Sequence, residues 1–204
     1  MIIKEACVES FLDAKIMVEA GANRIELCEN LSVGGTTPSY GTIIQCLKNL
    51  NVPVLVMIRP RGGNFIYSDD EIEIMSNDIL LCKELGVKGI VLGVLNEKNE
   101  IHIPQLKYLV KLAKPMEITF HKAIDEVPDP LKALDILIEL GIDRILTSGK
   151  AETALAGKEL INKLIFAGKD KIQIVVAGKV TKENFQSICR EIPNNEYHGK
   201  KIVI

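Results

Sequence analysis

Short β-rich runs alternate with helical patterns along the whole chain, and this alternation constrains the fold more than any other feature. Seven such runs are visible, at residues 2–7, 24–28, 52–58, 89–94, 117–121, 144–147 and 172–177. The helical period is clearest after Ser68, where apolar residues recur every three or four positions from Ile72 to Cys82. Strands separated by helices pair in parallel, so the fold class is α/β, with either a closed barrel or an open doubly wound sheet.

Polar side chains near the ends of these runs distinguish the two architectures. Strands of an open parallel sheet are buried on both faces and are apolar throughout. Here polar residues recur at every second position, as in Glu5 with Cys7 and Glu26 with Cys28, and therefore share one face of the strand. No G-x-G-x-x-G fingerprint follows the first strand, which also argues against the open sheet. The pattern favours a TIM-type (β/α) barrel whose interior opens into a site at the carboxyl ends of its strands.

The last repeat of this barrel is the least complete. Residues 196–198 can form a short eighth strand, after which six residues remain, too few for an eighth helix. We therefore expect a single domain over residues 1–204 with an incomplete last βα unit. A missing helix would leave apolar barrel surface bare, which predicts a homo-oligomer, most simply a dimer, covering the flank beside the first and last strands.

Charge and composition limit the classes of binding partner that the sequence predicts. Lys and Arg number 25 against 27 Asp and Glu, and the net charge of −2 removes the electrostatic reason to expect nucleic acid or an anionic membrane. No apolar run reaches the roughly 18 residues of a membrane helix, and the amino terminus does not resemble a secretory signal. The five cysteines include no C-x-x-C pair. These features predict a cytoplasmic protein with free thiols, whose ligand is a metal ion or a small molecule.

Two of the cysteines are candidates for a metal site. Cys7 and Cys28 end the first two strands at equivalent places, so we expect their sulfur atoms to approach each other. A two-thiolate site suits Cu(I), or Zn(II) with an added nitrogen ligand such as His121. The alternative is that both are small buried hydrophobic residues. The remaining cysteines fall in helical patterns and are expected to pack in the core: Cys46, Cys82 and Cys189.

Further polar residues gather at the predicted mouth, because the carboxyl ends of parallel barrel strands meet there. They include Glu5, Glu26, Arg59, Arg61, Thr119, His121, Asp125, Thr147, Ser148 and His198. Buried carboxylates such as Glu5 and Glu26 need a cationic partner, for which Arg59 is expected, or a pKa raised by desolvation. Either they form a structural ion-pair network, or some of these groups act as catalytic acids and bases, with Glu5, Glu26, His121 and Asp125 as the candidates.

The loop at residues 59–64 indicates an anionic ligand. Arg59 and Arg61 place two guanidinium groups directly after a strand, where they could hold a carboxylate or phosphate by paired hydrogen bonds. The alternative is a surface loop whose Arg residues pair with local Asp and Glu. Loops after the sixth and seventh strands lie where many barrels bind phosphate through backbone amides. The predicted ligand-binding residues are Arg59, Arg61, Thr119, Lys122, Thr147, Ser148, Gly149 and Gly178.

Six segments carry longer motifs: Glu5-Ala6-Cys7, the residues 24–28, 34–39 and 57–63, the run from Thr119 to Asp125, and the residues 146–149. Together, and in this order, they resemble the CutC family of copper homeostasis proteins from about residue 2 to residue 178. The resemblance implies a TIM-type barrel, a cytoplasmic oligomer with a role in copper homeostasis, and Cu(I) binding at Cys7 and Cys28.

The chain departs from the family pattern in three places. Lys122 stands where the family usually has Arg, which keeps the charge and loses the planar guanidinium. The glycine-rich run after the seventh strand is here Ala177-Gly178-Lys179-Val180, which weakens the case for phosphate binding by that loop. Family chains also usually continue further beyond the motif at residues 196–198.

Three functional hypotheses follow. The leading one is a copper-handling protein that binds Cu(I) through Cys7 and Cys28. The second is a TIM-barrel enzyme acting on a small anionic substrate by acid/base chemistry, because a mouth with two Arg, two carboxylates and a His is more polar than a two-thiolate site requires. The third is a non-catalytic scaffold whose interior charges serve only stability.

Overall fold

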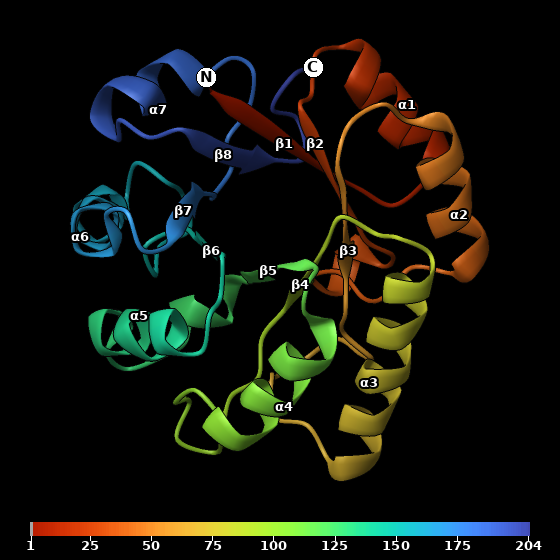
Figure 1. Ribbon diagram of the computed structural model, residues 1–204. Coiled ribbons are helices and arrows are strands. Elements are labelled where there is room, and N and C mark those ends of the chain that lie inside the picture. Colours follow the sequence, from red (N-terminus) through yellow and green to blue (C-terminus); the bar gives the residue numbers. More distant parts are fainter. Residues whose placement is uncertain (1) are drawn as a thin grey trace.

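Eight parallel strands close into a barrel in the computed structural model, and helices wrap its outside (Figure 1). The strands follow one another around the barrel in chain order, and the first pairs with the last. The structure describes residues 2–204, so Met1 lies outside it. This arrangement confirms the predicted TIM-type barrel.

The elements have the following bounds. The strands are β1 (Ile3–Val8), β2 (Arg24–Leu27), β3 (Val54–Met57), β4 (Gly89–Leu92), β5 (Glu117–Phe120), β6 (Arg144–Thr147), β7 (Gln173–Val176) and β8 (Glu196–Gly199). The α-helices are α1 (Phe11–Glu19), α2 (Tyr40–Asn49), α3 (Asp69–Glu84), α4 (Ile103–Ala113), α5 (Pro130–Glu139), α6 (Lys158–Gly168) and α7 (Phe185–Glu191). Two short 3₁₀ helices, η1 (Leu31–Val33) and η2 (Lys122–Asp125), follow β2 and β5. The eighth strand is present as expected, and residues 200–204 form no helix. Within residues 2–204, no helix combines the length and the apolar character needed to cross a bilayer.

Local signals in the sequence account for the helix starts. The Ser68 hydroxyl accepts a hydrogen bond from the backbone N–H of Glu71, and the Glu71 carboxylate accepts one from the N–H of Ser68. This reciprocal capping satisfies two backbone donors that α3 would otherwise leave unpaired. Ser10, Ser39 and Asp129 cap α1, α2 and α5 in the simpler way, through one side-chain oxygen.

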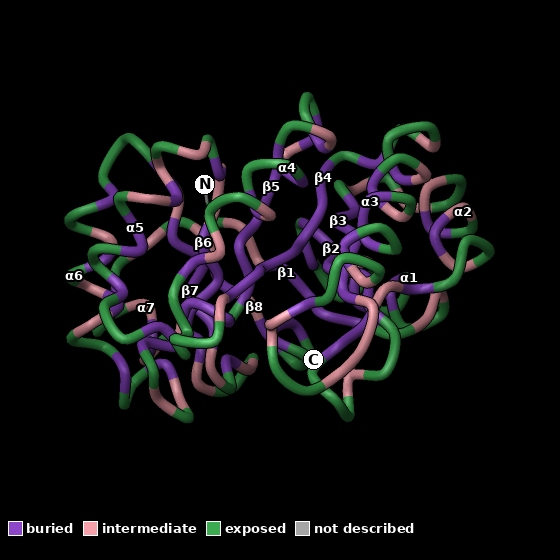
Figure 2. Tube along the Cα trace, turned by 90° about the horizontal axis from the view of Figure 1, so that it is seen from below, coloured by how far each residue is buried: buried purple, intermediate pink, exposed green. Residues whose placement is uncertain are grey.

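The alternation along each strand sorts side chains between the helices and the barrel interior. Apolar residues on the outer face, such as Ile25, Val56 and Ile90, pack into one large core with the helices. Figure 2 shows this burial concentrated in the strands at the centre, with exposed turns around the edge. The inner face carries polar and charged groups together with a small apolar cluster that includes Leu55 and Val91. The interior is therefore polar enough to hold a site.

Neighbouring strands are staggered, as barrel closure requires. In the β1–β2 ladder Glu5 lies opposite Arg24, and Cys7 lies opposite Glu26. Cys28 therefore stands one side-chain level nearer the mouth than Cys7. The expectation that the two cysteines occupy equivalent places is wrong, because the stagger is set by the closure of all eight strands.

Candidate functional site

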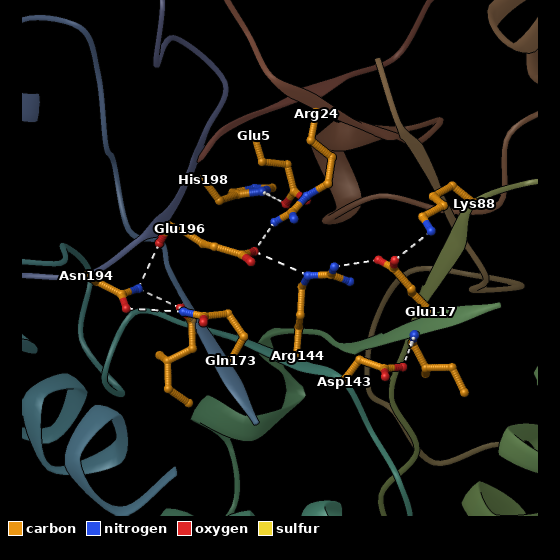
Figure 3. Close-up of polar contacts among 12 residues, drawn as sticks. Glu5, Arg24, Lys88, Glu117, Asp143, Arg144, Gln173, Asn194, Glu196 and His198 are labelled. Atoms are coloured by element: carbon orange, nitrogen blue, oxygen red, sulfur yellow. Dashed lines mark hydrogen bonds and ion pairs between the residues drawn. The ribbon is translucent and has the colours of Figure 1, made fainter. Parts of the chain in front are cut away.

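A chain of alternating charges crosses the amino-terminal part of the barrel interior (Figure 3). Arg24 Nε lies 2.5 Å from Glu5 Oε2, and its Nη2 binds Glu196. Arg144 lies 2.5 Å from Glu117 and 3.3 Å from Glu196. Glu5 is 1% exposed and Arg24 is 5% exposed, so this ion pair is held away from water. The network neutralises carboxylates that burial alone would make unstable.

Arg59, the expected partner of Glu5 and Glu26, is bonded elsewhere, so that expectation is wrong. Its guanidinium is buried and donates to three backbone carbonyls, those of Val33, Gly35 and Gly63, at 3.0, 2.9 and 2.7 Å. It ties the loop after β2 to the loop after β3. Arg24 fills the predicted role for Glu5, and His198 is the charged neighbour of Glu26. The position of Arg24 at period two with Glu26 on the same strand is the signal that identifies it as an inward-facing residue.

Arg61 is also committed within the protein. It lies 2.5 Å from Glu71 and donates to backbone carbonyls of its own loop, including that of Ile66 at 2.7 Å. The two guanidinium groups thus hold the loop after β3 and the start of α3. This is the alternative that the sequence left open, in which the Arg residues pair locally.

His198 lies where the interior network meets the two cysteines. Its Nδ1 is 2.8 Å from Glu5 Oε1, and its Nε2 is 3.7 Å from Glu26 Oε2. Cys28 Sγ lies 3.7 Å from Glu26 Oε2 and 3.9 Å from Cys7 Sγ. Ligand atoms of Cys7, Glu26 and His198 all lie within 4.8 Å of one another. Two thiols, an imidazole and a carboxylate therefore converge on one small volume.

Burial and neighbouring charges set the protonation of this cluster. Burial opposes the ionisation of Glu5, but Arg24 and the hydrogen bond from His198 outweigh it and hold its pKa at about 2. Burial disfavours the charged form of His198, yet Glu26 and the contacts with Cys7 and Glu5 raise its pKa well above the usual value. Burial, helped by the charge of Glu5, raises the pKa of Glu26. His198 is thus an imidazolium ion that faces two carboxyl groups.

Both thiols are protonated in this state. The hydrogen bond with Cys28, burial and the charge of Glu26 raise the pKa of Cys7 well above its usual value. The contact with Cys7 lowers the pKa of Cys28, but burial and Glu26 together raise it to about 11. A metal ion bound here must displace protons, because the thiolate is the ligand form of cysteine.

The donor set fits a soft metal ion. Two metal–sulfur bonds, at the length of about 2.3 Å known for zinc thiolates, can span the 3.9 Å between the sulfur atoms. The contact of His198 Nδ1 with the Glu5 carboxylate leaves Nε2 facing Cys7 and Glu26, which is how metal-binding histidines are commonly oriented. His198, rather than His121, is therefore the nitrogen donor beside the sulfur atoms.

Asp125 organises the loop after β6. Its carboxylate accepts hydrogen bonds from the hydroxyls of Thr147 and Ser148, at 2.5 and 2.9 Å, and from the backbone N–H groups of Ser148 and Lys150, both at 3.0 Å. The N–H of Gly149 donates to the Thr147 hydroxyl. The N–H groups of Ser148, Gly149 and Lys150, in the loop after β6, are thus already bonded within the protein.

The glycines of this region are explained by close backbone contacts. A Cβ on Gly149 would lie 2.3 Å from the carbonyl oxygen of Gly157, and one on Gly178 would lie 2.6 Å from the backbone nitrogen of Ala154. Both residues also have φ values in the left-handed region, +68° and +108°. Packing between loops accounts for these glycines without a ligand.

A cavity of about 210 Å³ opens at the mouth above the cysteines. Its polar lining comes from Cys7, Glu26, Arg59, His121, Lys122, His198 and Lys200, and its apolar lining includes Leu31, Met57, Phe65 and Leu146. Thr119, by contrast, is buried beneath the mouth with a hydroxyl that has no partner among the described residues. Both candidate histidines and Cys7 thus line one cavity, and Cys28 lies 3.9 Å from Cys7 without lining it.

Comparison with known proteins places the chain in a family. A model of the CutC family matches residues 2–203. The copper homeostasis protein cutC homolog of Homo sapiens is 44% identical over 196 residues, which cover 96% of this chain and 72% of the human protein. The family protein CutC of Enterococcus faecalis is 42% identical over 209 residues, covering 99% of this chain and 100% of that protein.

A solved structure agrees with these matches along the whole barrel. The crystal structure of CutC from Streptococcus agalactiae has a TM-score of 0.95 and 41% sequence identity, covering 99% of this chain and 100% of that one. Fold, motifs and near-complete coverage lead to one conclusion. This chain belongs to the CutC family of copper homeostasis proteins.

Proposed function

We propose that the protein handles copper by binding Cu(I) at a centre formed by Cys7, Cys28 and His198. The observation that carries this proposal is the convergence of two thiols 3.9 Å apart with an imidazole nitrogen at the end of an otherwise charge-balanced barrel interior. Relatives named copper homeostasis proteins support the proposal, because their sequences are 44% identical to this chain over 96% of its length.

The chemistry of the donors favours Cu(I) over harder ions. Thiolates are soft ligands that select Cu(I) and zinc, whereas magnesium and calcium prefer oxygen. His198 carries a proton between Glu5 and Glu26, so a metal ion that binds its Nε2 must displace that proton as well. Binding of Cu(I) at all three donors would release the Nε2 proton and both thiol protons, so the affinity for Cu(I) should rise with pH.

The strand stagger also favours a metal ion over a disulfide at these cysteines. Because Cys7 lies opposite Glu26, Cys28 is displaced by two residues along the neighbouring strand. A rise of about 3.3 Å per residue and a strand spacing of about 4.8 Å put the two Cα atoms roughly 8 Å apart. A disulfide needs Cα atoms closer than about 7 Å, so bonding the sulfurs directly would require the backbone to move.

The cytoplasmic location and the dimer expected from the sequence belong to the same proposal. Cell fractionation tests the first. Light scattering at micromolar concentration tests the second, and a species of 22.5 kDa would contradict self-association.

Competition for Cu(I) against a chromophoric chelator tests the centre. We expect Cys7→Ser and Cys28→Ser each to weaken Cu(I) binding by tenfold or more, and His198→Asn to weaken it measurably. Cys189→Ser is the matched control, since this partly exposed cysteine lies on α7, away from the mouth, and its substitution should leave the affinity unchanged. Equal affinity in the wild type and all four variants would remove the proposed site.

A further inference from the structure

The cavity at the barrel mouth contains a hydrogen-bond donor that nothing in the copper proposal uses. His121 is 4% exposed and lines the cavity. Its Nδ1 accepts a hydrogen bond from the backbone N–H of Ala123 at 3.2 Å. Burial and the nearby charge of Arg59 lower the pKa of His121 to about 3, so the ring is neutral near neutral pH. A neutral imidazole with an accepting Nδ1 carries its hydrogen on Nε2.

This Nε2–H has no acceptor among residues 2–204. Buried donors are nearly always paired with protein, water or ligand, because leaving one unpaired forfeits its hydration. An unpaired donor on a residue that lines a cavity therefore indicates a partner that occupies the cavity.

The surrounding packing keeps the His121 ring in place. The ring lies 4.7 Å from the Phe65 ring and 5.9 Å from the Phe120 ring, measured between centroids. A Cβ on Gly93 would stand 2.5 Å from His121 Cε1, so the glycine makes room for the imidazole. A donor held in this way is suited to orienting a ligand rather than adapting to one.

Charge and shape indicate the class of ligand. Lys122 and Lys200 both line the cavity and have exposed side chains. The ammonium group of Lys122 lies 3.8 Å from the Asp125 carboxylate, and that of Lys200 lies 3.4 Å from the carbonyl oxygen of Leu31. Two ammonium groups at the rim attract an anion. The apolar lining from Leu31, Met57, Phe65 and Leu146 suits a short hydrocarbon body.

We propose that this cavity binds a small organic carboxylate, with the Nε2–H of His121 donating to one of its oxygen atoms and with Lys122 and Lys200 supplying positive charge. Inorganic phosphate fits less well, because the loop amides that would hold it are bonded to Asp125 and Thr147. The site goes beyond copper binding and uses a different set of residues, although Cys7 and His198 border the same cavity.

Calorimetric titration of the metal-free protein with acetate, propionate and pyruvate, and with inorganic phosphate for comparison, tests the proposal. At least one of the three carboxylates should bind the wild type more tightly than phosphate does. His121→Phe keeps a ring and removes the donor, so it should weaken that binding tenfold or more. Lys122→Met should weaken it by a smaller factor.

Matched controls exist for both variants. His102 also accepts a backbone N–H through Nδ1, at the start of α4 and outside the cavity, so His102→Phe should leave binding unchanged. Lys163→Met is the control for Lys122→Met, because Lys163 is exposed on α6.

A measurement on the unmodified protein covers the case in which His121→Phe fails to fold. The side-chain ¹⁵N and ¹H signals of His121 should shift on addition of the bound carboxylate, while those of His102 stay in place. The proposal is overturned if none of the three carboxylates binds, if phosphate binds as tightly as they do, or if binding leaves the His121 signals unchanged. Copper binding is measured separately on Cys7→Ser, so failure of one proposal leaves the other standing.

Discussion

Replacing Arg24 by Met should destabilise the barrel more than any surface charge change. Arg24 is 5% exposed and binds both Glu5 and Glu196. Methionine fills a similar volume and removes the positive charge, so Glu5 keeps only His198 and Glu196 keeps only Arg144 as a partner. Breaking a buried ion pair on one side typically costs about 3–5 kcal/mol, because the remaining charge is left uncompensated.

The pKa of Glu5 reports the combined effect of Arg24 and His198 against burial. Its fall from 4.5 to about 2 corresponds to about 3 kcal/mol, at about 1.4 kcal/mol per pKa unit. Because the folded-state pKa is lowered, this stabilisation is fully present above pH 4.5 and is lost as the pH falls towards 2. In Arg24→Met the pKa of Glu5 should rise. The difference in stability from the wild type should therefore be largest near neutral pH and shrink in acid.

Denaturant unfolding followed by far-UV circular dichroism measures the effect, since the chain has no Trp to serve as a fluorescent probe. A double-mutant cycle with Glu5→Gln isolates the pair. We expect the two changes together to cost at least about 2 kcal/mol less than the sum of the single changes. Lys158→Met is the control, because its partner Glu191 and Lys158 itself are about half exposed, and it should change little. Additivity of Arg24→Met and Glu5→Gln within about 0.5 kcal/mol would refute the reasoning.

Three further outcomes are expected. After storage in air and unfolding, Cys7 and Cys28 should both still react with a thiol reagent, because the strand stagger opposes a disulfide between them. A protein mass lower by two hydrogen atoms, with these two thiols unreactive, would contradict this. Gly93→Ala should lower the free energy of unfolding by about 1–3 kcal/mol, since its Cβ meets His121; an unchanged denaturation midpoint would count against the ring position. Asp125→Asn should speed amide hydrogen exchange in the loop after β6, because the Asp125 carboxylate accepts hydrogen bonds from the backbone of that loop. Unchanged exchange rates would contradict a stabilising role of Asp125 in the loop.

Much of the fold was readable from the sequence because it depends on local patterns. Alternating polar and apolar residues identified the strands and their inward faces, and this pattern extended to the short eighth strand at Glu196–Gly199. The same pattern places Cys7, Cys28, Glu26 and His198 at one end of the barrel. Residues that meet at a barrel mouth need no proximity in sequence, only a place at the end of a strand.

The errors arose where the answer depends on the whole barrel or on loop conformation. The stagger between β1 and β2 follows from the closure of eight strands, so no local pattern could show that Cys7 lies opposite Glu26. Arg59 bonds backbone carbonyls of two loops, and such partners leave no mark in the sequence. The carboxylate of Asp125 accepts hydrogen bonds from amides of the loop after β6, and the sequence alone does not show this because it depends on the path of the loop.

X-ray absorption spectroscopy of the Cu(I)-loaded protein tests the central claim most directly. The account predicts one copper ion per chain with two sulfur ligands and one nitrogen ligand. In Cys28→Ser one sulfur should be lost, and in His198→Asn the nitrogen contribution should be lost. Copper bound in the wild type without sulfur neighbours, or a sulfur signal that survives replacement of both Cys7 and Cys28, would contradict it.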